Sequence, residues 1–176
     1  FRYLLDESPW ARPEGAVSMW VKPVSWFDVA DVEERGLMVF CRLPLRRGAL
    51  LIERQGLRKS PPVRQDLLIA GVFGVPEITN ALVLPTNTSR WKNGDWHFVA
   101  VNWSRTGLAC SLDGAEFQKT AFTRALQPDD GSGISPSLEL GGGNADPEET
   151  TLVDDVVLYR RPLSIEEVRR LCDYDQ

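Results

Sequence analysis

His97 is the only histidine in the chain, so a serine or cysteine triad would have to use it as the base. It follows Trp96 at the start of an apolar run that ends at Trp103 and has the length of a β-strand. A histidine in such a strand is more often held by packing and one hydrogen bond than used for proton transfer. We therefore interpret His97 as structural and expect no catalytic residue of this kind.

Asp154 and Asp155 are the other candidates for chemistry, because glycoside hydrolysis uses two carboxylates. These groups must flank the same glycosidic bond, about 5 to 9 Å apart. Successive residues of a strand point to opposite faces, so two adjacent aspartates should not cooperate. The sequence predicts that the protein is not an enzyme.

Asp154, Val156 and Leu158 occupy alternate positions of a predicted strand, so their side chains should point to the same face. The two apolar residues are expected to face the core, and a partly buried Asp154 carboxylate is therefore predicted. A buried carboxylate needs backbone N–H groups or a cation as partners. A calcium ion would use hard oxygen ligands close in sequence. These ligands would be Asp146, Glu148, Glu149 and Asp154. Because the segment lacks the alternating spacing of calcium loops and contains Pro147, we predict a hydrogen-bonded Asp154 and no cofactor, with calcium as the alternative.

Six tryptophans are many for a chain of 176 residues. Three belong to predicted strands and are expected to pack in the core: Trp20, Trp96 and Trp103. The others lie in loops or at strand edges, where an exposed indole is unusual unless it packs down or stacks on a ligand. The candidate ligand-binding residues are therefore Trp10, Trp26 and Trp91.

Short apolar runs separated by Gly, Pro and Asn indicate the strands that would position these residues. The expected strands are 1–5, 16–22, 37–43, 49–54, 66–73, 79–84, 96–103, 108–112, 138–140 and 151–160, with a further strand after the Asp113-Gly114 turn. Their spacing predicts an all-β fold, a two-sheet antiparallel jelly-roll sandwich, as a single domain over 1–176.

Residues 16–22 illustrate the expected faces of a half-buried strand. Alternation places Val17, Met19 and Val21 on one face and leaves Trp20 on the more polar face, with Ser18 and Lys22.

One helix is predicted, over 164–172. Ser164 and Glu167 form a capping box, in which each side chain accepts a hydrogen bond from the backbone N–H of the other residue. Val168, Leu171 and Cys172 then form an apolar stripe that should pack on the sandwich.

Composition excludes several classes of partner. A net charge of −5 with dispersed Lys and Arg argues against nucleic-acid binding, and no apolar run is long enough to span a membrane. Three widely spaced cysteines indicate neither a zinc site nor a disulfide framework, and Cys41 and Cys110 are expected to be buried hydrophobes, with one disulfide as the alternative. Because the chain begins at Phe1, we expect a mature fragment or an excised domain.

Four segments follow one another in an order that a known family shares. They are VSMWVKP at 17–23, WHFVAV at 96–101, LDG at 112–114, and VDDVVLYRRPLS at 153–164 with the helix after it. Together they resemble the laminin-G-like, pentraxin-like branch of the concanavalin A-like lectin/glucanase superfamily. The resemblance implies a two-sheet jelly roll, although the N-terminal strand is shorter here and the E-x-D-x-E run of the glucanases is absent.

The resemblance also implies an extracellular or cell-surface protein whose ligand is a glycan or a protein surface. We therefore expect a non-catalytic binding module with neighbouring domains in a larger protein. One alternative is a structural or assembly domain that packs on a neighbouring domain or on another copy of itself. A divergent glycoside hydrolase is a further alternative, since fold does not determine function.

Overall fold

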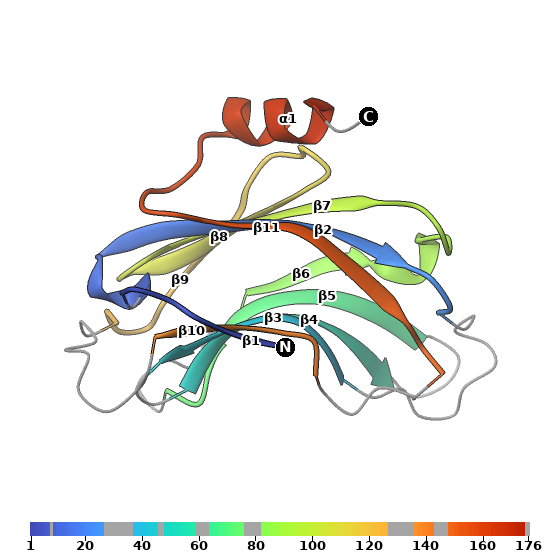
Figure 1. Ribbon diagram of the computed structural model, residues 1–176, viewed down its shortest axis with the longest axis horizontal. Coiled ribbons are helices and arrows are strands. Elements are labelled where there is room, and N and C mark those ends of the chain that lie inside the picture. Colours follow the sequence, from blue (N-terminus) through green and yellow to red (C-terminus); the bar gives the residue numbers. More distant parts are fainter. Residues whose placement is uncertain are drawn as a thin grey trace.

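A computed structural model of the chain describes residues 1–7, 9–26, 37–45, 48–58, 64–75, 82–126, 136–142 and 148–174. Within these ranges, strands form two sheets that pack face to face, and a helix lies on the outside of one sheet (Figure 1). The strands are β1 (Arg2–Leu4), β2 (Glu14–Pro23), β3 (Leu37–Leu45), β4 (Gly48–Arg58), β5 (Arg64–Phe73), β6 (Leu82–Asn87), β7 (His97–Ser104), β8 (Gly107–Leu112), β9 (Gln118–Ala121), β10 (Ser137–Leu140) and β11 (Thr151–Tyr159). The helix is α1 (Ile165–Tyr174), and two short 3-10 turns are η1 (Pro9–Ala11) and η2 (Thr88–Arg90).

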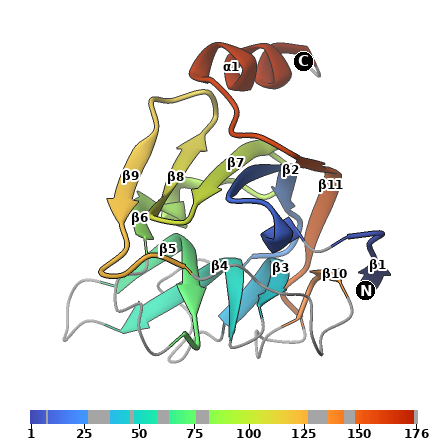
Figure 2. The ribbon, with the colours of Figure 1, turned by 90° about the vertical axis from the view of Figure 1, so that its left-hand side faces the viewer.

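The strand order confirms the predicted antiparallel sandwich. One sheet has the order β1-β10-β3-β4-β5-β6 and the other the order β11-β2-β7-β8-β9. Edge strands β1 and β11 lie on one side of the molecule, while β6 and β9 lie on the other (Figure 2).

The core lies between the two sheets, where alternate residues of each strand point inward. Val17, Met19 and Val21 of β2 are fully buried there, as their alternation predicts. Cys41 and Cys110 are also buried and free, which confirms their interpretation as small hydrophobes. Burial raises the pKa of the Cys41 thiol to about 12 and raises that of Cys110 as well.

Helix α1 covers the outer face of the five-stranded sheet (Figure 1). Val168 and Cys172 pack there with Trp20 and Phe98, whose ring centroids are 5.1 Å apart. Trp20 is therefore buried, which confirms the prediction that it packs, but the prediction that its face of β2 is the polar one is wrong for this part of the strand. The physical reason is that the apolar stripe of an amphipathic helix needs a partner surface. Among the helices that the structure describes, none is long and apolar enough to cross a membrane.

The start of α1 is fixed by the predicted capping box. Ser164 N donates to Glu167 at 2.8 Å, and Glu167 N donates to Ser164 Oγ at 3.2 Å. The Arg161 guanidinium, followed by the Ser164 N–H, holds the pKa of Glu167 at about 2. The buried Asn102 side chain bonds both the N–H and the carbonyl of Leu163, which ties the chain entering the helix to β7.

A bulge in β11 changes the faces of its residues. The pairing with β2 shifts between Asp154 and Val157, and Asp155 has a φ of +46°. A bulge inserts one extra residue and so reverses the alternation beyond it. Val153 and Val156 both pack against the core, whereas Asp154 and Asp155 are both exposed. The predictions of a partly buried Asp154, and of two aspartates on opposite faces, are therefore wrong.

Strand β6 differs from its predicted range of 79–84 because it continues through Pro85 to Asn87. It is an edge strand, and its pairing with β5 shifts so that Leu84 and Pro85 have no partner. An edge bulge tolerates proline, since no ladder hydrogen bond is needed there.

Glu53 in the middle of β4 is 1% exposed, although it is a carboxylate. It pairs in register with Val39 of β3 and Ile69 of β5. One oxygen accepts a hydrogen bond from Gln55 at 2.6 Å, and the other has no hydrogen-bond partner among the described residues. Burial raises the pKa of Glu53, and the bond from Gln55 opposes this shift only in part.

Glu53→Gln is expected to raise the free energy of unfolding by about 1 to 3 kcal/mol at pH 8, because it removes a buried charge with an unsatisfied oxygen. A raised pKa means that the folded state binds the proton more tightly, so stability falls as pH rises through that pKa. At pH 4 the variant should gain little. Urea denaturation at both pH values measures this, and an equal change at pH 4 and pH 8 would contradict the assignment of a buried charge.

Candidate functional site

An acidic groove of about 890 Å³ opens on the outer face of the five-stranded sheet, beside the C-terminal part of α1. The turn before β7, the turn after β8, the bulge of β11 and the end of the helix all contribute to it. Its lining consists of Trp20, Gly94, Asp95, Trp96, His97, Asp113, Asp154, Asp155, Cys172 and Asp173. Five of these side chains are aspartates, all of them exposed. The groove therefore presents hydrogen-bond acceptors and negative charge.

Backbone strain is concentrated at this groove. Asp113 and Asp155, with φ values of +50° and +46°, are the non-glycine residues with positive φ in the described part of the chain, and both line it. Asp113 is fixed by a bond from Phe98 N at 2.7 Å and by His97 Nδ1 at 2.9 Å. Strained positions of this kind persist where surrounding contacts hold them, and they often mark functional sites.

Trp96 supplies the exposed aromatic surface of the groove. Its side chain is 39% exposed, so its predicted role in the core is wrong. Trp96 shares strand parity with Phe98 and Ala100, which pack beneath α1. It lies just before β7, where the ammonium of Lys22 is 4.5 Å from its ring centroid. The indole is therefore positioned but still accessible.

His97 is held as the sequence predicts, by packing and one hydrogen bond. Its ring stacks on Trp91 with centroids 3.9 Å apart, and Asp113 bonds Nδ1. The histidine thus connects the groove to the aromatic interior.

The three tryptophans proposed as ligand contacts lie elsewhere. Trp26 is 7% exposed; its Nε1 donates to Thr151 at 2.6 Å, and the Arg54 guanidinium lies 4.0 Å from its ring centroid. Trp91 is half-buried and stacks between Trp26 and His97. Trp10 belongs to η1, and its side chain lies outside the described residues. The protein itself therefore occupies the surroundings of Trp26 and Trp91.

The calcium alternative named four residues, and Asp146 lies outside the described residues. Glu149 is buried in an ion pair with Arg54, both oxygens lying 3.2 Å from Nη1. Glu148 is exposed, and Asp154 Oδ1 accepts a bond from Asp155 N at 2.9 Å in the groove. Within the described ranges, no group of three or more His, Cys, Asp or Glu side chains could hold a metal ion.

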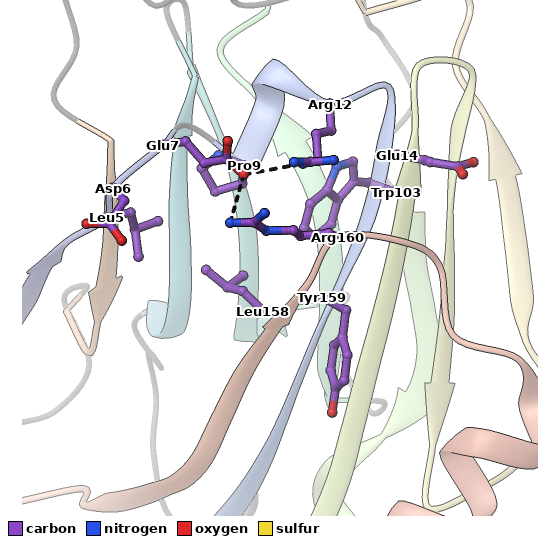
Figure 3. A pocket seen from close by; sticks show the side chains of 10 residues that line it. All are labelled: Leu5, Asp6, Glu7, Pro9, Arg12, Glu14, Trp103, Leu158, Tyr159 and Arg160. Atoms are coloured by element: carbon purple, nitrogen blue, oxygen red, sulfur yellow. Dashed lines mark hydrogen bonds and ion pairs between the residues drawn. The ribbon is translucent and has the colours of Figure 1, made fainter.

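A second, smaller pocket of about 160 Å³ lies where the N-terminal segment meets the end of β11 (Figure 3). We call it the arginine pocket, after Arg12 and Arg160. It is lined by Leu5, Asp6, Glu7, Pro9, Arg12, Glu14, Trp103, Leu158, Tyr159 and Arg160. The sequence gives no signal for it, since its charged residues are far apart in the chain.

Several solved structures share the fold. The binding domain of botulinum neurotoxin DC in complex with SialylT has a TM-score of 0.65 at 11% identity, covering 99% of this chain and 39% of that chain. A botulinum neurotoxin type C structure, described with cell entry dependent on two ganglioside molecules, has a TM-score of 0.62 at 12% identity, covering 93% and 36%. The neurotoxin DC binding domain in complex with rat synaptotagmin II has a TM-score of 0.54 at 11% identity, covering 93% and 36%.

These likenesses show a common fold, and this chain spans less than two fifths of the length of those proteins. No curated protein sequence matches the chain. Residues 73–169, more than half of the chain, match the family described as the concanavalin A-like lectin/glucanases superfamily. The segments that carry the resemblance at 96–101, 112–114 and 153–164 fall in this range, at the start of β7, at the end of β8 with its turn, and on β11 with the residues that lead into α1. The chain belongs to the concanavalin A-like lectin/glucanases superfamily.

Proposed function

We propose that the protein is a non-catalytic binding module that takes a neutral glycan in the acidic groove. The observation that carries this proposal is the exposed Trp96 indole beside five aspartate carboxylates. An indole offers an apolar face for the C–H surface of a sugar ring, and carboxylates accept hydrogen bonds from its hydroxyls. The negative charge of the groove disfavours an acidic sugar there, since like charges repel.

Similar structures support a binding role, since they are described in complexes with SialylT or synaptotagmin and in relation to gangliosides. The groove itself also favours binding over hydrolysis. A general acid at neutral pH needs a carboxyl group in an apolar environment, and all five groove aspartates are exposed. We expect no release of reducing sugar from any glycan that binds.

The proposed module uses no metal cofactor. Glu149 is already paired with Arg54, and Asp154 faces the groove on the outer side of its sheet. Binding should therefore persist in a chelator such as EDTA. If glycan binding required calcium, the binding site would instead have to involve the 146–149 segment.

We further propose an extracellular or cell-surface setting, with neighbouring domains in a larger protein. This is supported by similar structures that are described as receptor-binding domains and are more than twice this length.

A basic protein segment is the second candidate ligand, because five carboxylates in one groove favour cations. Salt distinguishes the two ligands. Charge-driven binding should weaken strongly between about 50 and about 500 mM salt, because the Debye length falls to below about half of its initial value. Glycan binding should not depend on salt in this way.

Trp96→Ala is expected to weaken binding of the glycan by about thirtyfold or more, which corresponds to about 2 kcal/mol for a central tryptophan. A glycan array identifies the glycan, and isothermal titration compares the variants. Tyr3→Ala is the matched control, because Tyr3 is an exposed aromatic residue on β1, away from the groove. Equal affinity of Trp96→Ala and the parent protein would overturn the proposed site.

A further inference from the structure

The arginine pocket contains a carboxylate held by two guanidinium groups. Glu7 Oε1 lies 3.3 Å from Arg12 Nε and 3.3 Å from Arg160 Nη2. The two arginines come from the segment before β2 and from the residue that follows β11, and their side chains converge on this oxygen (Figure 3). The fold therefore builds a site in which two cations share one oxyanion.

The glutamate uses only part of the binding capacity of the two arginines. Each guanidinium has five N–H donors; one nitrogen of each lies 3.3 Å from Glu7 Oε1, and Arg12 Nε donates a hydrogen bond to this oxygen. A bidentate carboxylate would make stronger charge-assisted bonds than this single shared oxygen. The side chains of Glu7, Arg12 and Arg160 are 46%, 43% and 72% exposed, and exposed pairs of this kind are weak. A ligand carboxylate can therefore replace Glu7 at little cost.

The remaining lining of the pocket limits the kind of anion that fits. Trp103 and Leu158 form an apolar wall, and the carboxylates of Asp6 and Glu14 lie to the two sides, away from the ion pairs (Figure 3). Without Glu7, two positive and two negative side chains remain, which suits a monoanion better than a phosphate dianion. The carboxylates at the sides accept hydrogen bonds, so the ligand should also carry hydroxyl donors.

We propose that the arginine pocket binds the carboxylate of an acidic sugar, with Glu7 occupying that position until the ligand displaces it. This second site goes beyond the neutral glycan proposed for the acidic groove. The two sites lie at opposite ends of β7, whose eight residues span about 26 Å. Trp96→Ala should therefore leave this site intact, so the two proposals can fail independently.

The test titrates the full chain with D-glucuronic acid and with glucose, its neutral analogue, while NMR monitors the arginine side chains. Glu7→Gln is expected to bind glucuronate about threefold to fivefold more tightly than the parent, because a weak internal competitor is removed. Adding Arg160→Gln to this variant should abolish the gain. Glucose should bind neither protein at this site.

Glu139→Gln is the matched control, because Glu139 also lies between two arginines, Arg2 and Arg42, but outside this pocket. It should leave glucuronate affinity unchanged, and unaltered melting temperatures would confirm that the exposed substitutions preserve the fold. The proposal is overturned if Glu7→Gln brings no gain, or if Glu139→Gln brings the same gain. Tighter binding of N-acetylglutamate than of glucuronate would overturn it in favour of an acidic protein ligand.

Discussion

Glu149→Gln should lower the free energy of unfolding by about 3 to 5 kcal/mol, because it removes the charge that Arg54 faces in the protein interior. The two side chains are only 4% and 3% exposed, and Arg54 Nη1 lies 3.2 Å from the carboxylate. Arg54 also packs 4.0 Å over the Trp26 ring, so it cannot reach water without disturbing the aromatic interior. The cost is that of removing one charge from a buried, desolvated ion pair.

Glu116→Gln provides the matched control, since Glu116 pairs with Arg169 at 2.7 Å on the surface. Loss of an exposed pair costs no more than about 1 kcal/mol. Urea denaturation of both variants measures the difference. If Glu149→Gln were no more destabilising than Glu116→Gln, the Arg54–Glu149 pair would not be buried in solution.

Val156→Asp is expected to destabilise the fold by about 3 kcal/mol or more, because it places an unpaired charge against the core between the sheets. Its neighbour Val157 is 42% exposed, so Val157→Asp should change stability by only about 0.5 kcal/mol. Thermal or urea unfolding of the two variants tests which residue the bulge turns inward. A larger loss in Val157→Asp than in Val156→Asp would show that the bulge lies elsewhere.

The same bulge shows where prediction from the sequence stops. Strand alternation correctly gave the inward face of β2, because its pairing with β7 is regular from Glu14 to Val21. Strand alternation failed for Asp154 because the sequence does not mark the extra residue in β11. A glycine can mark a bulge, but here Asp155 itself adopts the positive φ. The groove depends on this displacement, which brings two adjacent aspartates to one side.

The tryptophans show a second limit, since position in a loop does not determine exposure. Trp26 follows β2, yet it is buried because Asn93 bonds both its N–H and its carbonyl, which holds the segment on the core. Trp96 adjoins a buried strand, yet it is exposed at the edge of the groove beside the last turn of α1. The sequence shows that Trp96 shares its strand face with Phe98, but it does not show how far α1 extends over that face. By contrast, the capping box located the helix, because its two bonds are local.

The location of glycan binding can be measured directly from the indole N–H signals of the six tryptophans in a ¹H–¹⁵N NMR spectrum. Single Trp→Phe variants assign each signal, and the neutral glycan found on the array is then titrated. Binding in the acidic groove predicts that the Trp96 signal shifts most, while the buried Trp26 and Trp103 signals stay nearly constant. A largest shift at Trp10 or Trp91, or no shift at Trp96, would contradict a glycan site in the groove.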